Sequence, residues 1–187
     1  MSRWPPDTSS RLKRVAIALF AERGFATVTA AEVAAGAGMT ERTFFRHFKA
    51  KEDVLFEDHA DLKAALIEAI AAAPAKMGAR GLMRLVAEFL SERFEPQRAM
   101  HRTLHAVISS DATLRMRALQ RDREWAAAVA AGFARRGYAA QRAATIAAVT
   151  TAAFGLVYLA WLSDTAPETL AQRFAAVELD LAQALAE

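Results

Sequence analysis

The sequence contains no cysteine among its 187 residues, and it has only eight glycines and five prolines. The absence of cysteine excludes disulfides, zinc–thiolate sites, iron–sulfur clusters and a cysteine nucleophile. Alanine, the strongest helix former, accounts for 46 residues, while β-branched and turn-forming residues are sparse. The composition therefore predicts an all-α fold and argues against all-β and α/β folds.

Charge is absent from one long run of the sequence, residues 143–163, which is long enough to span a bilayer. Two interpretations stay open for this run: a membrane-spanning helix, or a helix buried on all sides in a soluble protein. The second is favoured because the run contains three threonines and many alanines, which are only weakly hydrophobic. The N-terminus lacks the apolar segment of a signal peptide, so we expect a cytoplasmic protein.

Two short helices and a tight turn are predicted near the N-terminus. Apolar residues at 12, 15, 16, 19 and 20 recur every three or four positions and form the stripe of a first helix. Thr29 and Glu32 then form a capping box that begins a second helix. The sequence Gly-Ala-Gly at residues 36–38 predicts a tight turn after it, because glycine accepts positive φ angles freely.

A third helix is predicted over residues 41–48, with Thr40 as its N-cap. Phe44 and Phe48 are four residues apart, so they share a face that we expect to pack inward. The outward face then carries Arg42, Thr43, Arg46 and His47. Two helices joined by a short glycine-containing turn and braced by another helix are typical of a helix-turn-helix.

Positive charge is concentrated in this same segment. Residues 11–51 hold eight Lys or Arg against three Glu, whereas the formal net charge of the whole chain is only +3. The remainder of the chain is therefore slightly acidic. A local excess of cations on a helix-turn-helix is what binding to DNA phosphates requires.

The run from Gly24 to Leu55, GFATVTAAEVAAGAGMTERTFFRHFKAKEDVL, resembles the DNA-binding domain of TetR-family transcriptional regulators. The family's cap threonine, Ala-Gly turn, aromatic cluster, His-Phe pair and Lys-Glu pair are present in order. The resemblance covers about the first third of the chain. It implies a homodimer that binds a palindromic operator, and a repressor that is released by a small, largely apolar effector. Two recognition helices related by a two-fold axis would enter successive major grooves.

The resemblance also implies roles for individual residues in DNA binding. Arg42 stands early in the recognition helix and is the best candidate for reading a guanine. Phe45 departs from the family pattern, in which a tyrosine commonly donates a hydrogen bond to a phosphate. The full set of expected DNA-binding residues is Thr29, Thr40, Arg42, Thr43, Phe45, Arg46, His47 and Lys51.

We expect three parts along the chain: a flexible arm at residues 1–10, a helix-turn-helix DNA-binding domain at 11–51, and an effector-binding and dimerisation domain at 52–187. About nine helices are predicted in total. Beyond the DNA-binding domain they cover residues 52–73, 82–94, 97–109, 114–136, 140–163 and 168–186.

The C-terminal part is expected to bind the effector and to dimerise. Aromatic and methionine residues cluster in its later helices, and within this family such helices enclose the effector. The expected ligand-binding residues are Leu104, Met116, Trp125, Phe154 and Tyr158, with Arg98, Arg102 or Arg121 meeting any anionic group; an acyl-CoA-like or other hydrophobic ligand would fit. The homodimer is expected to form through helices near 140–163 and 168–186. The latter has an apolar stripe of Leu170, Phe174, Val177, Leu181 and Leu185, with Glu178 and Asp180 on its other face.

No enzyme or cofactor is expected. The sequence lacks a nucleophile elbow, a phosphate-binding glycine loop and a His-Glu-x-x-His motif. His101 and His105 have a spacing that could bind a metal, but Arg102 lies between them and no third ligand is evident. A helical enzyme and a membrane-attached helical protein remain the alternatives to a DNA-binding regulator.

Overall fold

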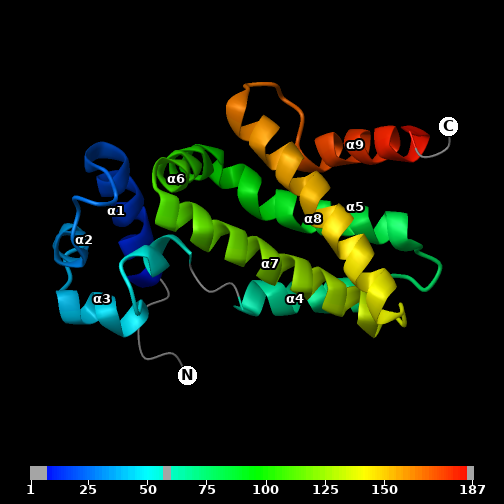
Figure 1. Ribbon diagram of the computed structural model, residues 1–187, viewed down its shortest axis with the longest axis horizontal. Helices are drawn as coiled ribbons and strands as arrows, with labels where there is room; N and C mark the ends of the chain where they lie inside the picture. The colour runs from blue at the N-terminus through cyan, green and yellow to red at the C-terminus, as the bar shows by residue number, and fades with distance from the viewer. Residues whose placement is uncertain (1–7, 57–59, 185–187) are drawn as a thin grey trace. The chain divides into compact units, whose positions relative to one another are not determined.

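The computed structural model describes residues 8–56 and 60–184, and all the regular secondary structure within these residues is helical. The α-helices are α1 (Thr8–Arg23), α2 (Ala30–Gly36), α3 (Glu41–His47), α4 (Ala60–Ala72), α5 (Ala79–Phe94), α6 (Arg98–Ser110), α7 (Ala112–Arg135), α8 (Ala140–Ser163) and α9 (Leu170–Ala184). Two short 3₁₀ helices, η1 (Glu52–Leu55) and η2 (Glu95–Gln97), precede the α4 and α6 regions (Figure 1). The all-α prediction is confirmed.

The described chain divides into two compact units. Unit 1 comprises residues up to 58 and residues 99–120, and unit 2 comprises residues 59–98 and 121–187. Most of α6 and the first turns of α7 therefore group with the N-terminal helices. The predicted boundary at residue 51 was drawn by function rather than compactness, and it stays a prediction. Most of the expected arm, residues 1–7, lies outside the described residues, while residues 8–10 already belong to α1.

Unit 1 is held together by a core that α1, α2, α3, η1, α6 and the start of α7 share. Leu12, Ala16 and Phe20 from the predicted stripe of α1 are buried in it, and Val15 and Leu19 pack against it. Val33 from α2 and Phe44 from α3 are fully buried in the same core. Figure 1 shows α1, α2 and α3 grouped together, from dark blue to cyan. The predicted apolar faces of these three helices are confirmed.

Unit 2 is built from α4, α5, α8, α9 and the remainder of α7. One of its cores joins α4, α5, α7 and α8 around Leu66, Leu82 and Phe133, and a second joins α5, α8 and α9 around Trp161 and Phe174. The helices pack closely where side chains are small. A Cβ atom on Gly132 of α7 would stand 2.7 Å from Cδ1 of Ile70 and 2.9 Å from its Cβ.

Three predicted elements differ from those observed. The expected helix over residues 52–73 is instead the 3₁₀ turn Glu52–Leu55 and a separate helix that begins at Ala60. Helix α8, which contains the uncharged run 143–163, is not buried on all sides, because only 33% of its most apolar 18-residue window is buried within the chain. By length and composition α8 is the one helix among the described residues that could cross a membrane.

The third difference concerns α9, whose buried face was predicted only in part: Leu170 and Phe174 are buried and Val177 packs against the core as expected. Its buried residues are Leu170, Phe174 and Glu178, which stand four residues apart. Leu181 is exposed instead, and Leu185 lies outside the described residues. Glu178 was expected on the polar face, but two arginines of α5 stabilise its carboxylate inside the protein.

Candidate nucleic-acid interface

The start of α2 is fixed by the capping box that the sequence predicts. The Thr29 hydroxyl accepts a hydrogen bond from the Glu32 backbone N–H at 3.2 Å, and the Thr29 backbone N–H donates to Glu32 Oε2 at 2.8 Å. The bond from the Thr29 N–H, the Arg23 guanidinium 2.7 Å from Glu32 Oε1 and the Thr29 hydroxyl 2.9 Å from Oε2 together lower the pKa of the Glu32 carboxyl to about 2. The backbone N–H of Thr29 makes the largest contribution to this shift, followed by Arg23. Both hydrogen bonds hold the first turn of α2 in place.

The turn between α2 and α3 depends on Gly38. Its φ of +68° lies in the left-handed region that side chains rarely adopt. The backbone N–H groups of Gly38 and Met39 donate to the carbonyls of Ala35 and Ala34 at 2.9 and 2.8 Å. The chain thus reverses within three residues and delivers Thr40 to the start of α3.

Helix α3 presents cations on one side and is anchored by aromatic rings on the other. Thr40 caps it by accepting from the Thr43 backbone N–H at 3.3 Å, as predicted. Phe44 is fully buried and Phe48 nearly so, which confirms their inward packing. Arg42 and Arg46 are exposed. Because the rings fix the axial rotation of α3, both guanidinium groups are offered to solvent.

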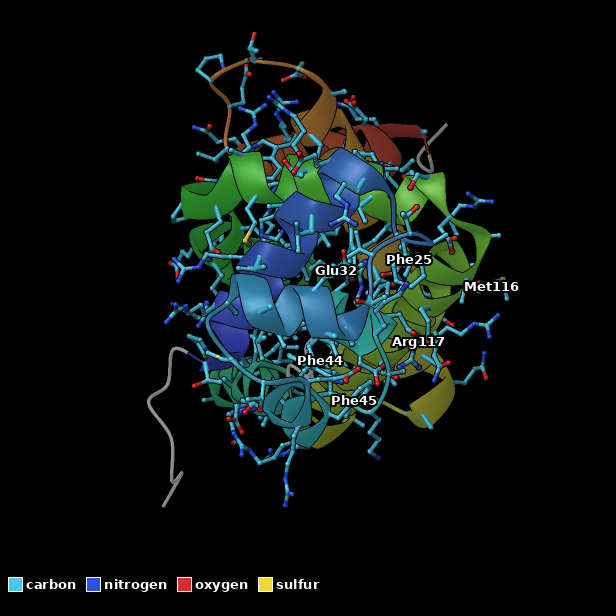
Figure 2. All side chains as sticks on the ribbon, turned by 90° about the vertical axis from the view of Figure 1, so that its left-hand side faces the viewer. Phe25, Glu32, Phe44, Phe45, Met116 and Arg117 are labelled. Carbon is cyan, nitrogen blue, oxygen red and sulfur yellow. The ribbon has the colours of Figure 1, made fainter. Side chains whose placement is uncertain are left out.

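Phe45 and His47 differ in how far they reach solvent. The Phe45 side chain is 48% exposed, and its ring meets the edge of Phe44 at 5.4 Å (Figure 2). His47, which was expected on the outer face, is half-buried, and its Nε2 atom is buried without a hydrogen-bond partner. Burial lowers the pKa of His47 below 6.5, and the neighbouring Arg46 lowers it further. The neutral ring is therefore favoured near pH 7.

Lys51 has a structural role that the sequence did not reveal. Its Nζ donates to the carbonyls of Phe25 and Val28 at 2.7 and 2.8 Å, and lies 4.2 Å from the centre of the Phe25 ring. An ammonium group has three N–H donors, so one remains for a phosphate. Lys51 thereby ties the segment after α3 to the loop between α1 and α2.

A second link in unit 1 was also missed. The Arg117 guanidinium of α7 forms an ion pair with Asp53 of η1, and the other carboxylate oxygen of Asp53 accepts from the Ala50 backbone N–H at 3.0 Å. Figure 2 labels Arg117 together with Phe44 and Phe45 of α3. Nothing in the local sequence pairs residues that lie 64 positions apart. The pair joins the segment that follows α3 to the first turns of α7.

The eight expected DNA-binding residues all lie in unit 1, on α3, on the two cap positions and on the segment that follows α3. The five expected ligand-binding residues are divided between the units. Leu104 is buried in the core of unit 1, whereas Met116 is 67% exposed on α7 of the same unit. Trp125, Phe154 and Tyr158 belong to unit 2.

The unit 2 candidates belong to an aromatic region. Phe154 and Tyr158 stack at 6.5 Å, and Phe94 meets their rings edge-on at 6.2 and 5.9 Å. Burial raises the pKa of Tyr158 to about 12, so its phenol is protonated at neutral pH. Trp125 packs against the neighbouring core.

The cations expected to meet an anionic effector already have partners. Arg98 donates to the carbonyls of Trp161 and Asp164 at the C-terminal end of α8, with distances of 3.0 Å from Nε and 2.6 Å from Nη2. Arg121 pairs with Asp122 at 3.1 Å. His105 shares a 3.4 Å contact with Ser109, and no group of three possible metal ligands is gathered in the part of the chain that the structure describes.

Comparison with known proteins agrees with this geometry. Residues 13–57 match the family model described as "Bacterial regulatory proteins, tetR family". No curated protein sequence matches the chain.

Several solved structures share the fold over nearly the whole chain. FadR from Thermus thermophilus, a TetR-family transcriptional repressor in complex with lauroyl-CoA, is 22% identical, with a TM-score of 0.59 and 92% of each chain covered. FadR from Bacillus subtilis, in complex with stearoyl-CoA, is 16% identical, with a TM-score of 0.65 over 92% of this chain and 96% of that one. A TetR-family regulator from Streptomyces coelicolor is 18% identical, with a TM-score of 0.57 and full coverage of both chains. Residues 13–57 therefore have the sequence of a TetR-family N-terminal domain, and the chain shares its fold with TetR-family regulators of known structure.

Proposed function

We propose that the protein is a repressor that binds a palindromic operator as a homodimer and is released by a small, largely apolar effector. The observation that carries the proposal is the arrangement of α3, whose buried phenylalanines hold Arg42 and Arg46 toward solvent. A helix of seven residues contacts few bases, so two copies are needed for a specific site.

The DNA contacts are assigned by chemistry and position. Arg42 and Arg46 can each form two hydrogen bonds with a guanine edge, and Thr43 can contact a thymine methyl group. Phosphates would be bound by the hydroxyls or backbone N–H groups at Thr29 and Thr40, by His47 and by the remaining N–H of Lys51. Phe45 offers an exposed ring that can pack against the sugar–phosphate backbone.

Dimerisation through α8 and α9 is supported by the exposed surface of both helices. Val149, Ala152, Leu156, Leu159 and Ser163 are exposed on α8 at spacings of three and four, as in the seam of a coiled coil. On α9, Leu179 and Leu181 are exposed while Glu178 is buried. Asp180 between these two leucines is also exposed, so the uncharged surface is the one on α8, which packs against α9. A second copy of the same α8 surface would cover it.

An apolar effector is supported by the aromatic region of unit 2 and by the acyl-CoA bound to the two FadR proteins. We assign its contacts to Trp125, Phe154 and Tyr158 of unit 2, with an acyl-CoA-like or other hydrophobic molecule as the ligand. Binding would favour a conformation with lower affinity for DNA, which is how a ligand shifts such an equilibrium. The protein would act in the cytoplasm, where both DNA and such metabolites are found.

Selection of bound fragments from the source genome tests the proposal. The purified protein should enrich palindromic sites whose half-sites are about one helical turn, or a multiple of it, apart. Affinity for an enriched site should fall steeply with salt, since each neutralised phosphate releases a counterion. Enrichment of no sequence, or an affinity that is independent of salt, would exclude operator binding.

A further inference from the structure

A surface pocket in unit 2 lies where the α4–α5 loop meets the end of α7. Its volume is about 520 Å³, within the range of small-molecule sites. It is lined by Ala71, Ala75, Lys76, Met77, Gly78, Arg135, Arg136 and Tyr138. None of these residues belongs to the DNA-binding or effector-binding sets assigned above. Three of the eight lining residues carry a positive charge at neutral pH.

The surroundings of the pocket contain more cations than carboxylates. Residues 69–87 and 125–163 contain six Lys or Arg and no Asp or Glu. Two carboxylates from other segments approach these cations: Glu68 pairs with Arg135, and Glu178 pairs with the arginines of α5. Within the described part of the chain, Lys76, Arg136 and Arg142 form no ion pair. A positive excess thus collects at one place in a unit whose Lys and Arg residues are equal in number to its Asp and Glu residues.

The positions of these cations are partly fixed. The Arg136 guanidinium donates to the carbonyls of Ala73, Pro74 and Met77, so it holds the loop and offsets the negative end of α4. Arg142 lies over the Tyr138 ring, 5.5 Å from its centre. Lys76 is exposed at the pocket. The Tyr138 phenol adds a hydrogen-bond donor.

We propose that this pocket binds a small molecule with two or more phosphate groups. Lys76 contributes a point charge and Tyr138 a hydroxyl donor from the lining, and Arg136 fixes the loop around them. Arg142 does not line the pocket but adds a guanidinium beside it, over the Tyr138 ring. The pocket is largely open to solvent, and its volume of about 520 Å³ suits a small phosphorylated metabolite. This site stands independently of operator binding, since it shares no residue with α3 or its flanking caps.

The chain has five lysines, at positions 13, 49, 51, 63 and 76. Chemical acetylation followed by mass spectrometry therefore measures how strongly a bound ligand protects each lysine from modification. Full-length protein is titrated with pyrophosphate at constant ionic strength. We expect saturable protection of Lys76 and no change at Lys63, which belongs to the same unit and pairs with Glu124 instead. Arg142→Gln should weaken this protection about fivefold, as loss of one exposed charged contact implies. Arg123→Gln, an exposed change on α7 outside the pocket, should leave it unchanged.

Three outcomes would overturn the proposal. The first is an unchanged Lys76 at millimolar pyrophosphate, and the second is equal protection of Lys63. The third is protection of Lys76 by duplex DNA as strong as that by pyrophosphate, which would make the patch part of a nucleic-acid surface. Protection of the three lysines of unit 1 by DNA tests the proposed function separately. Circular dichroism of Arg142→Gln checks that the variant is folded.

Discussion

Glu178 is the most informative residue for the stability of unit 2. Its side chain is only 4% exposed, and both carboxylate oxygens are engaged: Oε2 accepts from Arg84 Nε at 2.6 Å, and Oε1 accepts from Arg80. The carboxylate thereby ties α9 to α5. We predict that Glu178→Gln and Glu178→Ala both destabilise the protein, and that alanine has the larger effect.

The magnitude follows from these contacts. Each hydrogen bond to a charged group contributes about 1.5–3 kcal/mol. The arginine side chains are 53% and 44% exposed, so water solvates them when the carboxylate is removed and reduces the loss. Glutamine keeps the shape but leaves a buried NH₂ group facing arginine, which costs about 1–3 kcal/mol. Alanine also leaves a cavity, so we expect about 2 kcal/mol for Glu178→Gln and about 3 kcal/mol for Glu178→Ala.

Urea denaturation at one fixed protein concentration measures these differences and keeps any oligomerisation constant. The matched control is Glu92→Gln, because the Glu92 side chain is 79% exposed and lies 3.8 Å from Arg93. The control should change the free energy of unfolding by less than about 0.5 kcal/mol. Equal stabilities for Glu178→Gln and Glu92→Gln would refute the interpretation of Glu178 as a buried ionic link between α9 and α5.

Three further predictions concern packing, pH and assembly. Gly132→Ala should destabilise the protein by about 1–2 kcal/mol despite better helix propensity, because the new methyl group meets Ile70; a stabilised variant in thermal unfolding would contradict this. Glu32 has a folded-state pKa of about 2 against 4.5 ordinarily, so it contributes stability above pH 4.5 that is lost as the pH falls toward 2. The free energy of unfolding of Glu32→Gln should therefore depend less on pH between 4.5 and 2 than that of the wild type. An equal pH dependence in the two proteins would show that the Glu32 carboxylate in the capping box does not contribute this stability. Leu156→Arg should be monomeric in analytical ultracentrifugation, because it places a charge in the proposed dimer surface of α8. The control Ala127→Arg, at an exposed position of α7, should remain dimeric. A dimeric Leu156→Arg would show that the chains do not associate through this surface of α8.

The local features of unit 1 could be predicted from the sequence. A capping box, a glycine turn and a pair of phenylalanines four residues apart each involve neighbours within one or two helical turns. Their geometry is therefore determined by residues close in the chain, and Thr29, Thr40, Phe44 and Phe48 lie as expected.

Features that depend on distant residues could not be predicted. Arg117 meets Asp53 across 64 positions, and Glu178 meets Arg80 across 98. A carboxylate on a helix is normally solvated, so the burial of Glu178 beside Leu170 and Phe174 on α9 has no local signal. The partial exposure of α8 was missed for a related reason. An apolar helix surface can be covered either by other helices of the same chain or by a second copy of the chain, and the sequence of the helix does not distinguish the two.

The central claim is that α3 reads DNA through Arg42 and Arg46, presented by two chains on one operator. Its most direct test compares the affinities of Arg42→Ala, Arg46→Ala and the control Arg123→Ala for a selected operator and for a scrambled duplex. We expect each α3 variant to lose about 1–3 kcal/mol on the operator and far less on the scrambled duplex, with two chains bound per operator and no change for the control. Unchanged operator affinity in both α3 variants, or one chain bound per operator, would contradict the claim.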